Sequence, residues 1–64
     1  MAISLKAARV NADLTQKEAA KALGISKGTL ANYEMYRTSP SIDTAERIAD
    51  LYGQSKNDIV FRKE

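Results

Sequence analysis

The sequence predicts an all-α domain of five short helices. Ala, Leu, Lys and Glu dominate, apolar residues recur three and four positions apart, and no segment alternates apolar and polar residues as a strand would. A chain of 64 residues without cysteine cannot rely on disulfides or on thiolate metal sites. We therefore expect residues 1–64 to form one domain that is stabilised by packing and by well-capped helices.

The first two helices are marked by their caps and by apolar spacing. We expect the first from about Ser4 to Asn11 and the second from Thr15 to the residue before Gly24. Thr15 is followed three residues later by Glu18, a capping box in which each side chain satisfies the other residue's backbone N–H. The residues expected to face the core are Leu5, Ala8 and Ala12 in the first helix, and Ala19, Ala20 and Leu23 in the second.

A sharp turn separates the second helix from the third. Gly24 stands where a left-handed residue ends many helices, and Ser26 can cap a new helix two residues later. Because so little chain joins them, the two helices must cross at a steep angle, and Ala20 is small enough to let them approach. The third helix is expected from Ser26 to about Met35, and the arrangement is typical of a helix-turn-helix.

The rest of the chain is expected to form a loop and two more helices. The loop runs from Tyr36 to Pro40, because a proline keeps the preceding residue out of helical conformation. Ser41 caps a fourth helix that ends at Gly53, and a second capping pattern at Ser55 opens a short fifth helix. The apolar stripe of the fourth helix is Ile42, Ala45, Ile48, Ala49 and Tyr52, and the fifth helix holds Ile59, Val60 and Phe61.

Charge is distributed unevenly along the chain. The net charge of +2 is too small to identify a polyanionic partner by itself. The middle of the chain is nevertheless basic, whereas the fourth helix is acidic. The residues concerned are Lys17, Lys21, Lys27 and Arg37 in the middle, and Asp43, Glu46 and Asp50 in the fourth helix.

Several function classes lack the residues that they need. Without histidine or cysteine, no hydrolase triad, cysteine nucleophile or histidine metal site can be assembled. The acidic residues of the fourth helix are interpreted as a solvated face on which Arg47 pairs with Asp43. No apolar run approaches the ~20 residues of a membrane span, and the N-terminus lacks a signal-peptide layout. We expect a non-enzymatic protein of the cytosol, without catalytic residues, cofactor or metal.

The segment LTQKEAAKALGISKGTLANYE resembles the helix-turn-helix of the lambda-repressor-like family, the Cro and Xre type of phage and bacterial transcriptional regulators. A second segment, RTSPSIDTAERIADLYGQSKNDIV, is similar to the family's Pro-led fourth helix and short fifth helix. The resemblance covers roughly Leu5 to Val60. It implies a small Cro-like repressor with its helix-turn-helix at helices 2 and 3. The matching positions are Gln16, Ala20, Gly24, Ile25, Leu30 and Tyr33.

The resemblance also implies which residues contact DNA. The third helix, about 26–35, would lie in the major groove, with Lys27, Gly28 and Asn32 at base-contact positions. Lys27 would donate to guanine O6 and N7, and Asn32 would pair with adenine. Phosphate contacts would come from Gln16 and from Ser26 or Thr29, with Lys17, Tyr36 and Arg37 as further candidates.

Gly28 raises a separate question, because a glycine inside a helix costs ~1 kcal/mol relative to alanine. Either this loss of helix stability is tolerated without a function, or another molecule approaches the backbone closely at this position. Since Gly28 lies between Lys27 and Asn32, on the face that would enter the groove, we favour close approach. Plainer roles stay open for the other candidate contacts: Lys17 and Lys27 as solvated charges, Ser26 as a cap alone, and Thr29 as a helix residue with its hydroxyl turned back.

The loop after the third helix departs from the family's pattern. Met35 and Tyr36 stand where members usually carry Asn-Gly or a similar pair, so a phosphate-binding Asn is missing and a left-handed residue is less favourable. Tyr36 would either lie on the core or offer its hydroxyl to a phosphate. The resemblance further implies that Glu34 turns away from DNA and forms a buried ion pair with Arg9.

A single recognition helix suggests that two copies act together. We expect a homodimer on a pseudo-palindromic double-stranded DNA operator, with recognition helices ~34 Å apart. The candidate dimer contacts are Ile59, Val60 and Phe61, because three consecutive apolar residues of a helix cannot all face one small core. The alternative is a protein-interaction module of the same fold, such as an antitoxin or an antirepressor.

Overall fold

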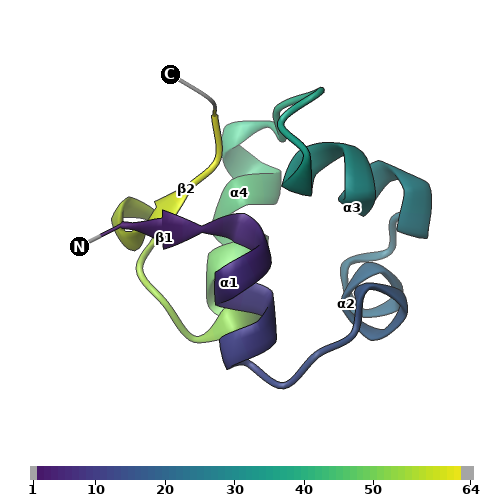
Figure 1. Cartoon of the computed structure of the whole chain (residues 1–64), viewed down its shortest axis with the longest axis horizontal. Helices are drawn as coiled ribbons and strands as arrows, with labels where there is room; N and C mark the ends of the chain where they lie inside the picture. Colours follow the sequence, from purple (N-terminus) through teal and green to yellow (C-terminus); the bar gives the residue numbers. More distant parts are fainter. Residues whose placement is uncertain (1, 63–64) are drawn as a thin grey trace.

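Four α-helices and two very short strands are found in residues 2–62, which are the residues that the computed structural model describes. In Figure 1 the strands lie side by side near the two ends of the chain, with α1 and α4 next to them and with α2 and α3 on the far side. The helices are α1 (Leu5–Asn11), α2 (Gln16–Leu23), α3 (Lys27–Glu34) and α4 (Ile42–Tyr52), and a 3₁₀ turn follows at Lys56–Asp58. The strands are β1 (Ile3–Ser4) and β2 (Ile59–Val60).

The mostly helical architecture is confirmed, but the fifth helix is not formed. Ser55 does cap a turn, since its hydroxyl accepts from Asn57 N at 3.3 Å, yet the chain then becomes extended. Ile59 and Val60 pair in parallel with Ile3 and Ser4. Two consecutive β-branched residues favour an extended backbone, and pairing with β1 supplies backbone hydrogen-bond partners along one edge of this segment. The five-helix prediction is therefore wrong at its C-terminal end.

Capping residues start all four α-helices of the described chain. Each cap has an extended backbone, and its side-chain oxygen accepts from the backbone N–H three residues later. The capping box of Thr15 and Glu18 is present in both directions. The caps are Ser4, Thr15, Ser26 and Ser41.

A left-handed residue follows each of the four helices, directly after α2 and α4 and one residue later after α1 and α3. Gly24 (φ 73°) and Gly53 (φ 69°) end α2 and α4, as the sequence predicts for Gly24. The equivalent residues after α1 and α3 are Asp13 (φ 60°) and Tyr36 (φ 59°). Behind α3, Tyr36 N donates to the Tyr33 carbonyl and Arg37 N to the Asn32 carbonyl, which satisfies the last carbonyls of the helix.

The core is built from all four helices and β2, and most of the residues expected to face inward do so. Ala12 and Tyr33 are only partly buried. Ile42 is 72% exposed, which contradicts its place in the predicted stripe. Ile42 is the first residue of α4, and burial on that helix begins only at Ala45. The buried apolar residues are Leu5, Ala8, Ala19, Ala20, Leu23, Leu30, Ala45, Ile48, Ala49, Tyr52 and Ile59. Within the described residues, none of the helices has both the length and the apolar character to cross a membrane.

Candidate nucleic-acid interface

The α2–turn–α3 unit is held by hydrogen bonds at both helix starts and at the end of α2. Glu18 Oε1 accepts from Thr15 N at 2.9 Å, and these hydrogen bonds with Thr15 lower the pKa of Glu18. At the start of α3, Ser26 Oγ accepts from Thr29 N at 3.0 Å, and the two hydroxyl oxygens are 2.7 Å apart. The starts of α2 and α3 are therefore fixed by local hydrogen bonds, whereas the packing of the two helices against each other depends on core residues.

Arg47 of α4 adds a third restraint on this unit. Its Nη2 donates to the Leu23 carbonyl, the last residue of α2, at 2.8 Å. The predicted pairing of Arg47 with Asp43 is not formed, because a helix C-terminus offers an unsatisfied carbonyl that a guanidinium can reach. Glu46 instead forms an exposed ion pair with Lys56, at 3.4 Å.

The predicted DNA contacts fall on exposed or half-buried positions of α2, α3 and the following loop. Within residues 2–62, the basic groups of Lys17, Lys27 and Arg37 form no ion pair. The Asn32 side-chain amide likewise has no hydrogen-bond partner in this part of the chain, so it is available for an external one. Exposed positions are Lys17, Ser26, Lys27, Gly28 and Arg37, and half-buried positions are Gln16, Thr29, Asn32 and Tyr36.

Gly28 has space around it. A Cβ built on this residue would meet only Ser26 Oγ, at an ordinary contact distance of 3.9 Å. Its φ angle is not in the left-handed region, in contrast to those of Gly24 and Gly53. Neither packing nor backbone conformation of the free chain therefore requires a glycine at position 28.

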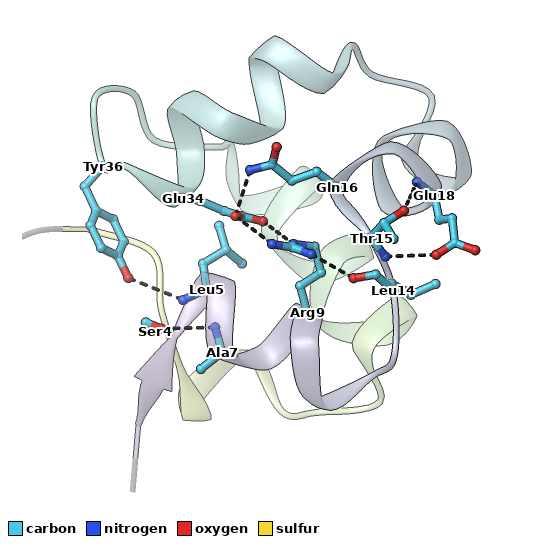
Figure 2. Close-up of polar contacts among 10 residues, drawn as sticks. All are labelled: Ser4, Leu5, Ala7, Arg9, Leu14, Thr15, Gln16, Glu18, Glu34 and Tyr36. Atoms are coloured by element: carbon cyan, nitrogen blue, oxygen red, sulfur yellow. Dashed lines mark hydrogen bonds and ion pairs between the residues drawn. The ribbon is translucent and has the colours of Figure 1, made fainter.

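The buried ion pair between Arg9 and Glu34 is present. Arg9 Nε lies 2.7 Å from Glu34 Oε2, and the two side chains are only 10% and 4% exposed. Arg9 Nη1 also donates to the Leu14 carbonyl at 2.8 Å, as Figure 2 shows. The hydrogen bond to Glu34 raises the pKa of Arg9, and its burial opposes that shift. Glu34 therefore turns inward, where its charge is compensated, and does not face a DNA backbone.

Gln16 joins the same cluster, a contact that the sequence analysis does not predict. Its Nε2 donates to Glu34 Oε1 at 3.0 Å (Figure 2). The two residues are 18 positions apart, so no helical spacing signals the contact. The predicted phosphate contact at the start of α2 thus has its side-chain amide anchored on the last residue of α3.

A sequence model described as helix-turn-helix matches residues 5–59 of the chain. The chain belongs to this helix-turn-helix family. The matched region contains all four α-helices, and the motif itself is formed by α2 and α3. The resemblance stated from the residues is therefore confirmed.

Two curated relatives of this helix-turn-helix chain are named as regulators. One is the cryptic phage CTXphi transcriptional repressor RstR of Vibrio cholerae, 38% identical over 88% of this chain and 50% of the relative. The other is the HTH-type transcriptional regulator ImmR of Bacillus subtilis (strain 168), 40% identical over 94% of this chain and 47% of the relative. The chain thus spans about half the length of these relatives. No solved structure gives a significant match.

Tyr36 of this helix-turn-helix domain is directed toward the chain's own backbone. Its hydroxyl accepts from Leu5 N at 3.3 Å and donates to the Val60 carbonyl at 3.2 Å. Of the two roles expected for Tyr36, the structure shows the inward one, at the junction of α1 and β2. The hydroxyl's single proton is already used, so Tyr36 is not placed as a phosphate donor.

The C-terminal apolar residues are placed differently from the prediction. Ile59 is buried in the core, with 5% exposure, and Phe61 packs against the core from the same strand face. Residues two apart on an extended segment share a face, so Ile59 and Phe61 can both pack inward where a helix could not allow it. Ile59 is therefore not available as a dimer contact.

Proposed function

We propose that this chain is a double-stranded DNA-binding transcriptional regulator, a small Cro-like repressor that reads the major groove with α3. The observation that carries the proposal is that α3 presents Lys27 and Asn32, whose side chains have no partner within residues 2–62, on a motif whose two helices pack together in the core. The names of the two relatives support it. Such a regulator acts by occupying DNA in the cytoplasm and needs no catalytic group, cofactor or metal.

Base recognition is assigned to the first two turns of α3. Lys27 would donate to guanine O6 and N7, and Asn32 would form a bidentate pair with adenine. Gly28 lies between them and is exposed, so the helix backbone can approach bases or phosphates there.

Phosphate contacts are assigned to α2, to the start of α3 and to the loop after it. Lys17 and Arg37 supply positive charge that forms no ion pair within the described residues, and Gln16 supplies an amide at the start of α2. Backbone N–H groups at both helix starts add donors that favour an anion. Ser26 and Thr29 share one hydrogen bond between their hydroxyls, which uses one of the two hydroxyl protons and leaves the other for a phosphate oxygen.

Dimerisation belongs to the same proposal. One recognition helix contacts one half-site, so specific binding calls for two copies on a pseudo-palindromic operator. With Ile59 in the core, Val60 and Phe61 are the half-buried residues of this segment that a partner copy could still cover.

Binding to duplex DNA as a function of salt tests the proposed function. A regulator that contacts several phosphates loses affinity steeply as salt rises, because bound counterions are no longer released. Footprinting on the DNA that flanks its own gene would then locate the operator. An antitoxin or antirepressor would instead show little salt-dependent DNA binding and a tight complex with a protein encoded beside it.

A further inference from the structure

One buried carboxylate connects three helices at the proposed DNA-binding surface. Glu34 is the last residue of α3, and its Oε2 lies 2.7 Å from Arg9 Nε of α1. Its Oε1 accepts from Arg9 Nη2 at 3.3 Å and from Gln16 Nε2, the first residue of α2, at 3.0 Å. The start of α2 is thus tied to the end of the recognition helix through a group that is only 4% exposed (Figure 2).

We propose that Glu34 is a positioning residue for the DNA-backbone contact of Gln16, an inference that rests on the proposed function. A free glutamine side chain samples many rotamers and loses that freedom when it binds. Glu34 accepts one amide proton of Gln16 and leaves the second for a phosphate oxygen. The amide is therefore oriented before DNA arrives, which removes part of the entropic cost of binding.

Arg9 makes this arrangement compatible with a nearby phosphate. A bare carboxylate beside Gln16 would repel the DNA backbone, but the Arg9 guanidinium compensates its charge. Arg9 is itself fixed by its hydrogen bond to the Leu14 carbonyl, 2.8 Å away. The cluster thus provides a fixed acceptor for Gln16 without a net negative charge.

Two double variants separate positioning from mere structural support. Arg9→Met with Glu34→Gln, and Arg9→Met with Glu34→Leu, both remove the ion pair and leave the net charge unchanged. Only the Glu34→Gln pair keeps an acceptor oxygen beside Gln16. Replacing both partners of a buried ion pair is tolerated far better than removing one. Circular dichroism must show native helix content for both double variants at the temperature of the binding assay.

Binding is measured to a random-sequence duplex of about 20 base pairs at low ionic strength, where phosphate contacts supply the affinity. Gln16→Met should weaken binding about tenfold, because it removes a hydrogen bond to a charged group. The double variant with Glu34→Leu should lose affinity by a similar factor, whereas the double variant with Glu34→Gln should retain most of the affinity. Adding Gln16→Met to the Glu34→Leu pair should then have little further effect. Lys27→Ala serves as the control. It should lower the DNA affinity by the same factor in the wild type and in the double variant with Glu34→Leu.

The inference is overturned if the two double variants bind DNA equally well. It is also overturned if Gln16→Met lowers the DNA affinity by the same factor in the wild type and in the double variant with Glu34→Leu. DNA binding itself would then stand. A wild-type chain that binds no duplex overturns the proposed function together with the inference.

A measurement on the unsubstituted protein tests the inference even if the double variants do not fold. Nitrogen relaxation of the side-chain amides should show Gln16 to be ordered in the absence of DNA, with Gln54 as the internal reference. Within residues 2–62 the Gln54 amide has no hydrogen-bond partner. A Gln16 amide as mobile as that of Gln54 would contradict positioning by Glu34.

Discussion

Tyr36 and Tyr52 carry the same hydroxyl group in opposite surroundings. The Tyr36 hydroxyl makes two hydrogen bonds, to Leu5 N and to the Val60 carbonyl. Tyr52 is 5% exposed, and its hydroxyl has no partner among the described residues. A buried polar group without a partner loses its hydration and gains nothing in return. Removing the two hydroxyls should therefore have different consequences.

Tyr36→Phe should lower the free energy of unfolding by about 1–2 kcal/mol, because it removes two partly buried hydrogen bonds and leaves their donor and acceptor unpaired. Tyr52→Phe should be neutral or should raise the free energy of unfolding by up to about 1 kcal/mol. Urea unfolding of the two variants and the wild type measures both effects. An equal loss in both variants would show that the Tyr52 hydroxyl is hydrogen-bonded in solution.

Tyr52 also predicts how stability depends on alkaline pH. Burial raises the pKa of Tyr52 from 10.0 to about 12, with the negative charge of Glu34 adding to the shift and Arg9 opposing it. The folded state thus keeps this proton at a pH where the unfolded state has lost it. The contribution is fully present below pH 10.0 and is lost as the pH rises through about 12.

Between these two pH values, the free energy of unfolding of the wild type should fall more steeply than that of Tyr52→Phe. Urea unfolding at several pH values measures the two slopes. Because every other titrating group is shared, their difference isolates Tyr52. Parallel slopes would mean that Tyr52 titrates alike in the folded and unfolded states.

At the scale of the element, α3 shows how a tyrosine can end a helix. Tyr36 occupies the left-handed position that Gly24 and Gly53 occupy after α2 and α4. A bulky residue is strained there, by about 1 kcal/mol relative to glycine. The two hydrogen bonds of the Tyr36 hydroxyl offset that strain, because they tie the end of α3 to α1 and β2.

Gly28→Ala should separate the needs of helix α3 from those of DNA binding. The added Cβ meets only Ser26 Oγ at 3.9 Å, so the free protein should gain about 0.5–1 kcal/mol of stability from better helix propensity. DNA affinity should fall, because the methyl group stands where the backbone is expected to approach the groove. Thermal unfolding and a binding titration test the two effects. If stability and DNA affinity both increase, DNA binding does not require a glycine at position 28.

At the scale of the whole molecule, the proposed dimer can be tested by sedimentation. With one recognition helix per chain, we expect two chains on one operator, and Val60→Ser should weaken that assembly. Sedimentation of the protein alone and with operator DNA measures the number of chains. A monomer in both conditions would contradict the dimer, and unchanged assembly of Val60→Ser would place the contact elsewhere.

Much of the fold follows from short-range patterns. Thr15, Ser26 and Ser41 predict the helix starts, because a cap and the N–H that it binds are three residues apart. Gly24 predicts the turn of the helix-turn-helix, because a glycine adopts the left-handed conformation that ends α2. The positions proposed to contact DNA follow from their places on these helices and from the family resemblance. In the part of the chain that the structure describes, the side chains of Lys27 and Asn32 have no partner.

The sequence by itself determined the four helices, their caps and the motif, since each depends on residues within a turn or two of one another. Only the tertiary structure decided that Ile59 would pair with Ile3, and that the Tyr36 hydroxyl would bridge to Leu5, 31 positions away. The Gln16 amide likewise meets its acceptor 18 positions along the chain. These contacts join groups that come together only when the helices pack, so no local spacing carries a signal of them.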